Sequence, residues 1–156
     1  MIQPGTIVKV LDNTLVKEIR CIKVLIKGKR PVATQGDVII GTIQKIGVTK
    51  QSILRSQKHL MGSKGSGKQK GPQFKRGDMV KAVVCRTKKG VDRNRGIGRG
   101  STSSSGIKVS FPTENACILV GANGQDPIAS RAKGPISSAI KSKGYTKLLS
   151  LGSTFV

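Results

Sequence analysis

Aromatic, acidic and histidine residues are scarce in this chain. Its 156 residues include three Phe, one Tyr and no Trp. A domain that reads single-stranded nucleic acid by stacking bases needs more aromatic side chains. The only histidine is His59, so a histidine-based zinc site or a Ser/His/Asp triad would rest on one side chain. The seven acidic residues are scattered, and we expect no catalytic residue, no cofactor and no metal.

Cysteines and long apolar runs are also few. Cys21, Cys85 and Cys117 are widely spaced, odd in number and form no C-x-x-C, so we expect buried thiols in a reducing compartment. No apolar run approaches the roughly 20 residues that cross a bilayer, so no membrane-spanning segment is expected. The first residues contain neither a signal h-region nor an Arg-rich presequence. We expect that targeting is not needed or that a presequence precedes this sequence.

Positive charge is abundant. Lys plus Arg is 29 and Asp plus Glu is 7, which gives a net charge of +22. Such an excess opposes compaction by self-repulsion unless a polyanion neutralises it. Nucleic acid is therefore the first expected partner, and an anionic membrane surface is the alternative at this point.

Five short runs rich in Val and Ile alternate with turns that contain glycine. They cover residues 6–11, 19–26, 38–43, 79–85 and 116–120. Strands of this length without intervening helices predict a small closed barrel rather than a parallel α/β sheet. In the fourth run Val80, Ala82 and Val84 share one face, and we expect that face to point into the core.

The C-terminal part changes its period. Ile136, Ala139 and Ile140 are spaced as on a helix, and Gly144 is placed to end it. Residues 145–151 form a second short helix or a strand. Both elements are expected to cap an open end of the barrel, giving an all-β fold with small α content in one domain over 1–156.

Two low-complexity stretches, residues 47–75 and 91–106, interrupt this domain as long basic loops. They are rich in Gly, Ser, Lys and Arg and too polar to order by themselves. Within the first, Gly62 to Lys68 matches most of a P-loop, which would suit a nucleotide hydrolase. Gln69 stands where the Ser or Thr for Mg²⁺ is needed, and no strand–helix unit surrounds it, so we interpret the match as chance.

Three turns concentrate cations where strands end. They are Lys27-Gly28-Lys29-Arg30-Pro31, Lys75-Arg76-Gly77 and Arg86-Thr87-Lys88-Lys89-Gly90. Arginine makes bidentate bonds to phosphate, and lysine supplies point charges. Three such turns on one small barrel predict a polyanion-binding surface.

Ordered motifs along the chain resemble the universal large-subunit ribosomal protein L-fourteen family in its bacterial form. They include Met1-Ile2-Gln3, Val10-x-Asp12-Asn13, Cys21-Ile22-Lys23-Val24-Leu25, Gly36-Asp37-Val38-Ile39, Lys75-Arg76-Gly77-Asp78-Met79-Val80, Arg86-Thr87-Lys88-Lys89-Gly90, Glu114-Asn115-Ala116-Cys117, Gly134-Pro135-Ile136 and Lys147-Leu148-Leu149-Ser150-Leu151. Arg131 also matches a family arginine. The resemblance implies a five-stranded barrel with a β-ribbon and short C-terminal helices.

The resemblance also implies partners and a location. It implies binding to large-subunit rRNA, ribosomal protein L-nineteen as a neighbour, a bridge to small-subunit rRNA, and docking of the ribosome-silencing factor. With these partners, no membrane partner is expected. Bacterial relatives lack loops as long as 47–75 and 91–106. A bacterial-type core with extra loops and this charge suggests a mitochondrial ribosome, with a plastid or the bacterial cytoplasm as alternatives.

We therefore expect a non-enzymatic, structural rRNA-binding protein of the large ribosomal subunit. The residues expected to hold phosphates are Arg20, Lys29, Arg30, Lys75, Arg76, Arg86, Lys88, Lys89, Arg93, Arg95, Arg99 and Arg131. The alternative is a free RNA-binding module or chaperone that acts off the ribosome.

Overall fold

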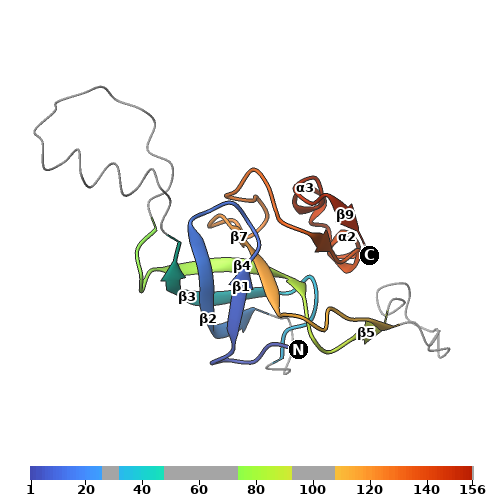
Figure 1. Ribbon diagram of the computed structural model, residues 1–156, viewed down its shortest axis with the longest axis horizontal. Coiled ribbons are helices and arrows are strands. Elements are labelled where there is room, and N and C mark those ends of the chain that lie inside the picture. The colour runs from blue at the N-terminus through green and yellow to red at the C-terminus, as the bar shows by residue number, and fades with distance from the viewer. Residues whose placement is uncertain (26–31, 48–73, 93–107, 156) are drawn as a thin grey trace, which may run out of the picture.

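A computed structural model describes residues 1–25, 32–47, 74–92 and 108–155. Five strands close into a barrel in the order β1-β2-β3-β4-β7 (Figure 1). They are β1 (Ile7–Val10), β2 (Val16–Leu25), β3 (Val38–Ile46), β4 (Met79–Arg86) and β7 (Ala116–Val120). Neighbours are antiparallel except β1 and β7, which run parallel and close the barrel. The predicted all-β barrel is confirmed.

Three turns of one kind lead into β1, β3 and β4. Their third residue is a glycine with φ of +88°, +82° and +95° at Gly5, Gly36 and Gly77, a backbone conformation that other residues adopt with strain. In the second turn Asp37 accepts hydrogen bonds from the backbone and hydroxyl of Thr34. In the third, Asp78 accepts one from the Lys75 backbone at 2.7 Å. Both carboxylates thus serve in turns.

The strands pack on two separate apolar cores. Val80, Ala82 and Val84 point into the barrel, which confirms the predicted inward face. Val83 and Cys85 point the other way and are also buried, in a second core outside the barrel. All five residues of β7 are buried. One wall of the barrel, β4 and β7, is therefore covered on both faces.

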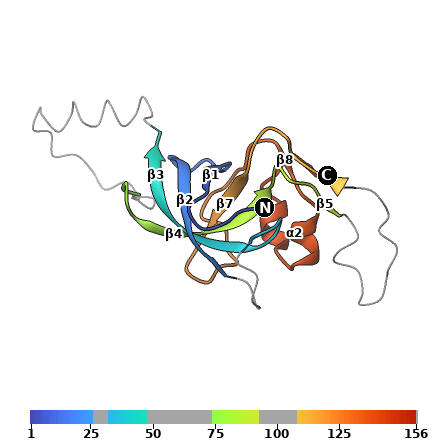
Figure 2. The ribbon, with the colours of Figure 1, turned by 90° about the horizontal axis from the view of Figure 1, so that it is seen from below.

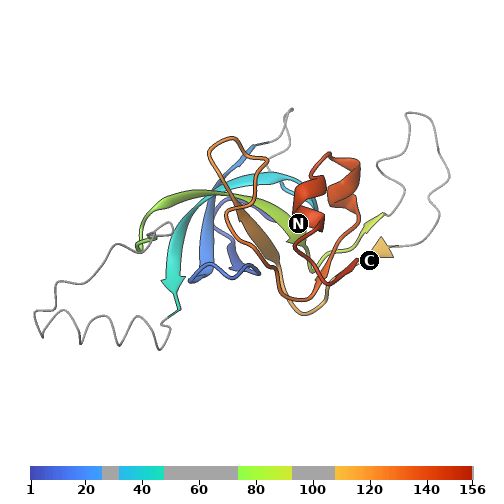
Figure 3. The same cartoon turned by 90° about the horizontal axis from the view of Figure 1, so that it is seen from above.

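The C-terminal segment supplies that outer cover. Helix α2 (Ala139–Ser142), helix α3 (Thr146–Leu149) and the parallel pair β8 (Pro135–Ile136) and β9 (Thr154–Phe155) gather beside one wall of the barrel (Figure 3). The predicted position over an open end was wrong, because the outward apolar residues of β4 and β7 offer a larger surface to bury.

The predicted helix starts later than its spacing suggested. Ile136 belongs to β8, so α2 begins at Ala139. Gly144 has φ of +89° and lies just beyond the helix, as predicted. The second element is the helix α3, which settles the choice between helix and strand.

A two-stranded antiparallel sheet, β5 (Val91–Asp92) with β6 (Lys108–Val109), lies outside the barrel. Figure 2 shows β5 leading away from it. Cys21, Cys85 and Cys117 are free and buried, as expected. No helix among the described residues is long and apolar enough to cross a bilayer.

Candidate nucleic-acid interface

A first group of cations lies near the start of β4. Lys75 and Arg76 are exposed on the turn that ends at Asp78, whose backbone N–H donates to the Lys75 carbonyl at 3.2 Å. Arg20, exposed on β2, pairs with Thr42 of β3, and Thr42 pairs with Met79 of β4. The register therefore places Arg20 two strands away from Met79, the first residue of β4, on the same level of the sheet as the end of this turn.

A second group lies beyond the other end of β4. The side-chain oxygen of Asn115 accepts the Lys88 backbone N–H at 2.9 Å, and the buried Thr87 hydroxyl donates to the Lys89 carbonyl at 2.9 Å. These bonds fix the backbone while both lysine side chains stay exposed. The Met1 amino group is close enough to this turn to feel its charge. The partial burial of that amino group, and secondarily the positive charge of Lys89, lower its pKa. The turn is thus a preorganised cationic site.

A third predicted cation, Arg131, lies next to the turn after β1. The Asn13 backbone N–H donates to the Arg131 carbonyl at 3.0 Å, and the Asn13 amide nitrogen donates to the Ser130 hydroxyl at 3.0 Å. The Arg131 side chain is exposed. These contacts hold its backbone and leave its guanidinium accessible to an anion.

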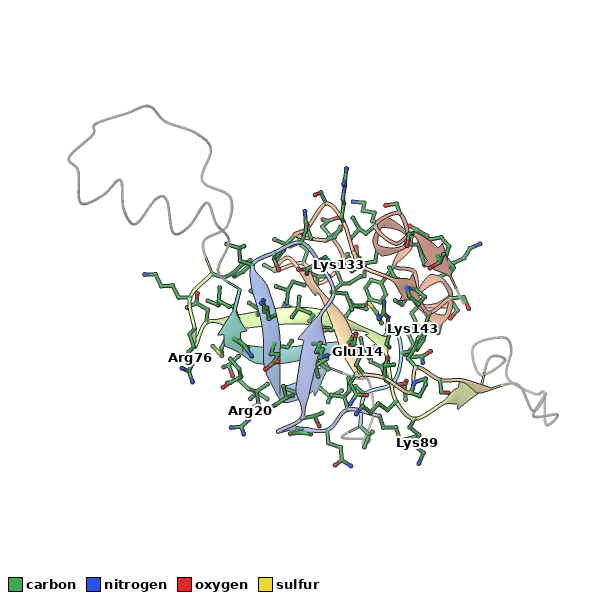
Figure 4. All side chains as sticks on the ribbon, in the orientation of Figure 1. Arg20, Arg76, Lys89, Glu114, Lys133 and Lys143 are labelled. Atoms are coloured by element: carbon green, nitrogen blue, oxygen red, sulfur yellow. The ribbon has the colours of Figure 1, made fainter. Side chains whose placement is uncertain are left out.

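The exposed cations of these three groups share one property. Within the part of the chain that the structure describes, none of them forms an ion pair, since the four ion pairs found there use Lys9, Arg86, Lys143 and Lys147. In Figure 4 Arg20, Arg76 and Lys89 extend outward from the barrel. Eight residues of β4 at about 3.3 Å each separate the first two groups by roughly 26 Å. This spread suits an extended polyanion better than one small anion.

Arg86 differs from the other predicted cations. Its side chain is 9% exposed. Its Nε donates to the Pro135 carbonyl at 2.7 Å, its Nη2 to the Lys133 carbonyl at 2.6 Å, and its Nη1 lies 3.3 Å from Glu114. The guanidinium carbon is 5.7 Å from the centre of the Phe111 ring. Arg86 therefore fastens the C-terminal segment to the barrel, which leaves little of its guanidinium exposed to a phosphate.

Sequence reasoning missed a further group of cations. Lys9, Lys17 and Lys133 line an open pocket of about 460 Å³ together with two carboxylates, Glu18 and Glu114. Glu114 lies 2.7 Å from Lys9, and the resulting hydrogen bond and attraction raise the pKa of Lys9. Lys133 directly precedes the family motif Gly134-Pro135-Ile136, and this position beside the motif is the sequence signal that could have identified it.

Other expected site residues lie outside the described residues. They are Lys29, Arg30, Arg93, Arg95 and Arg99. Most of the insertions 47–75 and 91–106, including His59 and the P-loop-like stretch, also lies outside them. Among the described residues, no three His, Cys, Asp or Glu side chains are grouped to hold a metal ion.

The family model described as ribosomal protein L14p/L23e matches residues 1–156, the full length of the chain. This family consists of structural rather than catalytic proteins of the large ribosomal subunit. The chain belongs to the ribosomal protein L14p/L23e family.

Proposed function

We propose that this protein binds large-subunit rRNA, with its barrel as a rigid platform and its cationic turns as the contacts. The observation that carries the proposal is the set of exposed cations at both ends of β4, which lack acidic partners among the described residues. Lysine and arginine side chains that neutralise phosphates release condensed counterions, and this supplies binding free energy. The scarcity of aromatics favours recognition of backbone and shape over base stacking.

The proposed contact residues are the remaining predicted cations. They are Arg20, Lys29, Arg30, Lys75, Arg76, Lys88, Lys89, Arg93, Arg95, Arg99 and Arg131. We add Lys133, which is exposed beside Gly134. Because the backbone at Lys88 and Lys89 is fixed by Asn115 and Thr87, these two lysines lose little backbone freedom on binding.

We also propose in which ribosome the protein lies and which neighbours it has there. The long basic insertions and the charge of +22 support a bacterial-type protein of the mitochondrial ribosome. In this assignment it lies on the intersubunit face, contacts small-subunit rRNA there, has ribosomal protein L-nineteen as a neighbour and receives the ribosome-silencing factor. A plastid or bacterial ribosome is the alternative location.

The salt dependence of rRNA binding tests the proposed contacts. About eight phosphate contacts predict a slope of log K against log salt of roughly −6 to −7. Replacing Lys88 and Lys89 together by Ala should make the slope shallower by about 1.4 to 1.8. Replacing Lys147, which is already paired with Asp126, by Ala is the matched control and should change it little. A wild-type slope near −1 would refute the proposal.

Sedimentation tests where the protein acts. Lysates from separated mitochondria and cytosol are resolved on gradients after a high-salt wash, and the protein is detected by antibody. Migration with the mitochondrial large subunit is expected. A protein that stays at the top of every gradient would favour a free RNA-binding module or chaperone, and migration with a cytosolic subunit would contradict the mitochondrial location.

A further inference from the structure

An apolar groove of about 450 Å³ opens between the start of β4, the end of β7 and the loop that follows β7. Apart from Lys81, its lining side chains are apolar. Val80 and Val120 are buried, and Phe74 and Ile128 pack against the barrel core while remaining partly exposed. The volume lies in the range of roughly 300–1,000 Å³ typical of ligand sites.

The loop that forms one side of the groove is held in place. The Gly121 N–H donates to the Asp126 carbonyl at 2.8 Å, and the Gly124 N–H donates to the Gly121 carbonyl at 2.9 Å. The Lys81 ammonium crosses to the Ala122 carbonyl at 2.6 Å. The groove is thus preformed, and these polar groups are already engaged within the protein.

The opposite side of the groove exposes a large apolar side chain. Met79 is 74% exposed, more than the other exposed large apolar residues among the described positions. A flexible thioether at the edge of an apolar groove adapts to different apolar occupants. Because Met79 lines the groove, its exposed side chain belongs to a contiguous apolar area and is not an isolated surface residue.

Charge around the groove is mainly positive. Lys81 lines it, and Lys75, Arg76 and Asp78 lie in the chain between its lining residues Phe74 and Met79. The other acidic residue described beside it, Asp126 of the bordering loop, is already paired with Lys147. Across the sheet, Lys23 pairs with Ile40, and Ile40 with Lys81, which adds another exposed cation along this face. An occupant therefore has to combine an apolar anchor with negative charge.

We infer that this groove receives an apolar side chain from an acidic segment of a neighbouring protein in the large subunit. A nucleobase also joins apolar faces to nearby negative charge. Its polar edges, however, would meet a mostly aliphatic lining whose hydrogen-bonding groups are engaged, and burying them unpaired is costly. An aliphatic or phenyl side chain flanked by Asp or Glu has no such cost. The flanking carboxylates would lie near Lys23 and Lys81, two cations that are not among the proposed rRNA contacts.

Photo-crosslinking in assembled large subunits tests the inference. Benzoylphenylalanine is placed at Ala122, which is exposed at the edge of the groove, and crosslinked peptides are sequenced. The expected product joins position 122 to an apolar residue of another protein, with at least two Asp or Glu within four residues. A crosslink to rRNA, to residues 48–73 of the same chain, or no crosslink would overturn the inference.

Second-site variants test whether the groove itself makes the contact. Met79→Glu should reduce the crosslink yield at least tenfold, because it removes the apolar contact and repels the acidic segment. Met79→Leu should retain it. Ile22→Glu, on an exposed site of β2, is the matched control and should also retain it. Equal loss in both Glu variants would overturn the inference. Each variant is first shown to sediment with the large subunit, which separates failure of this contact from failure of the proposed rRNA binding.

Discussion

Arg86→Ala should destabilise the protein strongly, although a neighbouring cation can be removed with little effect. A hydrogen bond to a charged group contributes about 1.5–3 kcal/mol, and Arg86 donates two short ones to the carbonyls of Lys133 and Pro135. Removing the guanidinium leaves Glu114 with Lys9 as its remaining partner, but also relieves the cost of a buried charge. The expected net loss is about 3–5 kcal/mol in the free energy of unfolding.

Urea unfolding followed by circular dichroism measures this loss. With a slope of about 2 kcal/mol/M, the midpoint should fall by roughly 2 M. Arg86→Lys should lose roughly half as much, since an ammonium cannot reproduce the planar two-carbonyl geometry. Lys88→Ala, two residues along and exposed, should change stability by less than about 0.5 kcal/mol. A loss below about 1 kcal/mol for Arg86→Ala would refute the assignment of Arg86 as the fastening residue.

Three further predictions concern the barrel interior, the glycine beside Arg86 and the buried cysteines. Val84→Asp should lower the unfolding free energy by several kcal/mol or prevent folding, because the carboxyl would be buried in the barrel; a thermal melt like that of the parent would show that the inward face is misassigned. Gly134→Ala should cost more than 1 kcal/mol, because its Cβ would lie 2.5 Å from Arg86 Nη2 and φ is +75°; the same urea titration would contradict this if the midpoint were unchanged. Burial raises the pKa of all three cysteine thiols, so at pH 8 Ellman's reagent should label them slowly in the native protein and rapidly in urea; rapid native labelling would be inconsistent with their burial.

The strands could be predicted from sequence because each barrel run is rich in β-branched residues and is bounded by a turn. The start of β2 was missed by three residues, since Lys17 and Glu18 interrupt its apolar pattern between the buried Val16 and Ile19, where the pairing with β3 is irregular. The position of the C-terminal helices could not be predicted. A short apolar run such as Ala116–Val120 does not say which of two cores each side chain enters.

The basic motifs of the candidate site could be predicted from the sequence, but which of their cations are exposed could not. Arg86 and Lys88 stand two residues apart in one basic motif and look equivalent in sequence. The carbonyls of Lys133 and Pro135 distinguish them, because they approach Arg86 through tertiary packing across more than 40 residues. Exposure and pairing, which decide whether a cation is available to a phosphate, are properties of the folded chain.

The two-sided burial of β4 and β7 also affects how the chain folds during synthesis. A nascent chain that has emerged only to residue 120 contains every barrel strand. The outward side chains of Val83, Cys85 and Ile118 would still face water, because Ile136, Ile140 and Leu148 have not yet been translated or released. Long-range pairing is slow to form, and exposed apolar surface at that stage favours aggregation. The last 25 or so residues therefore protect the finished barrel, and a chain truncated before them should depend on chaperones.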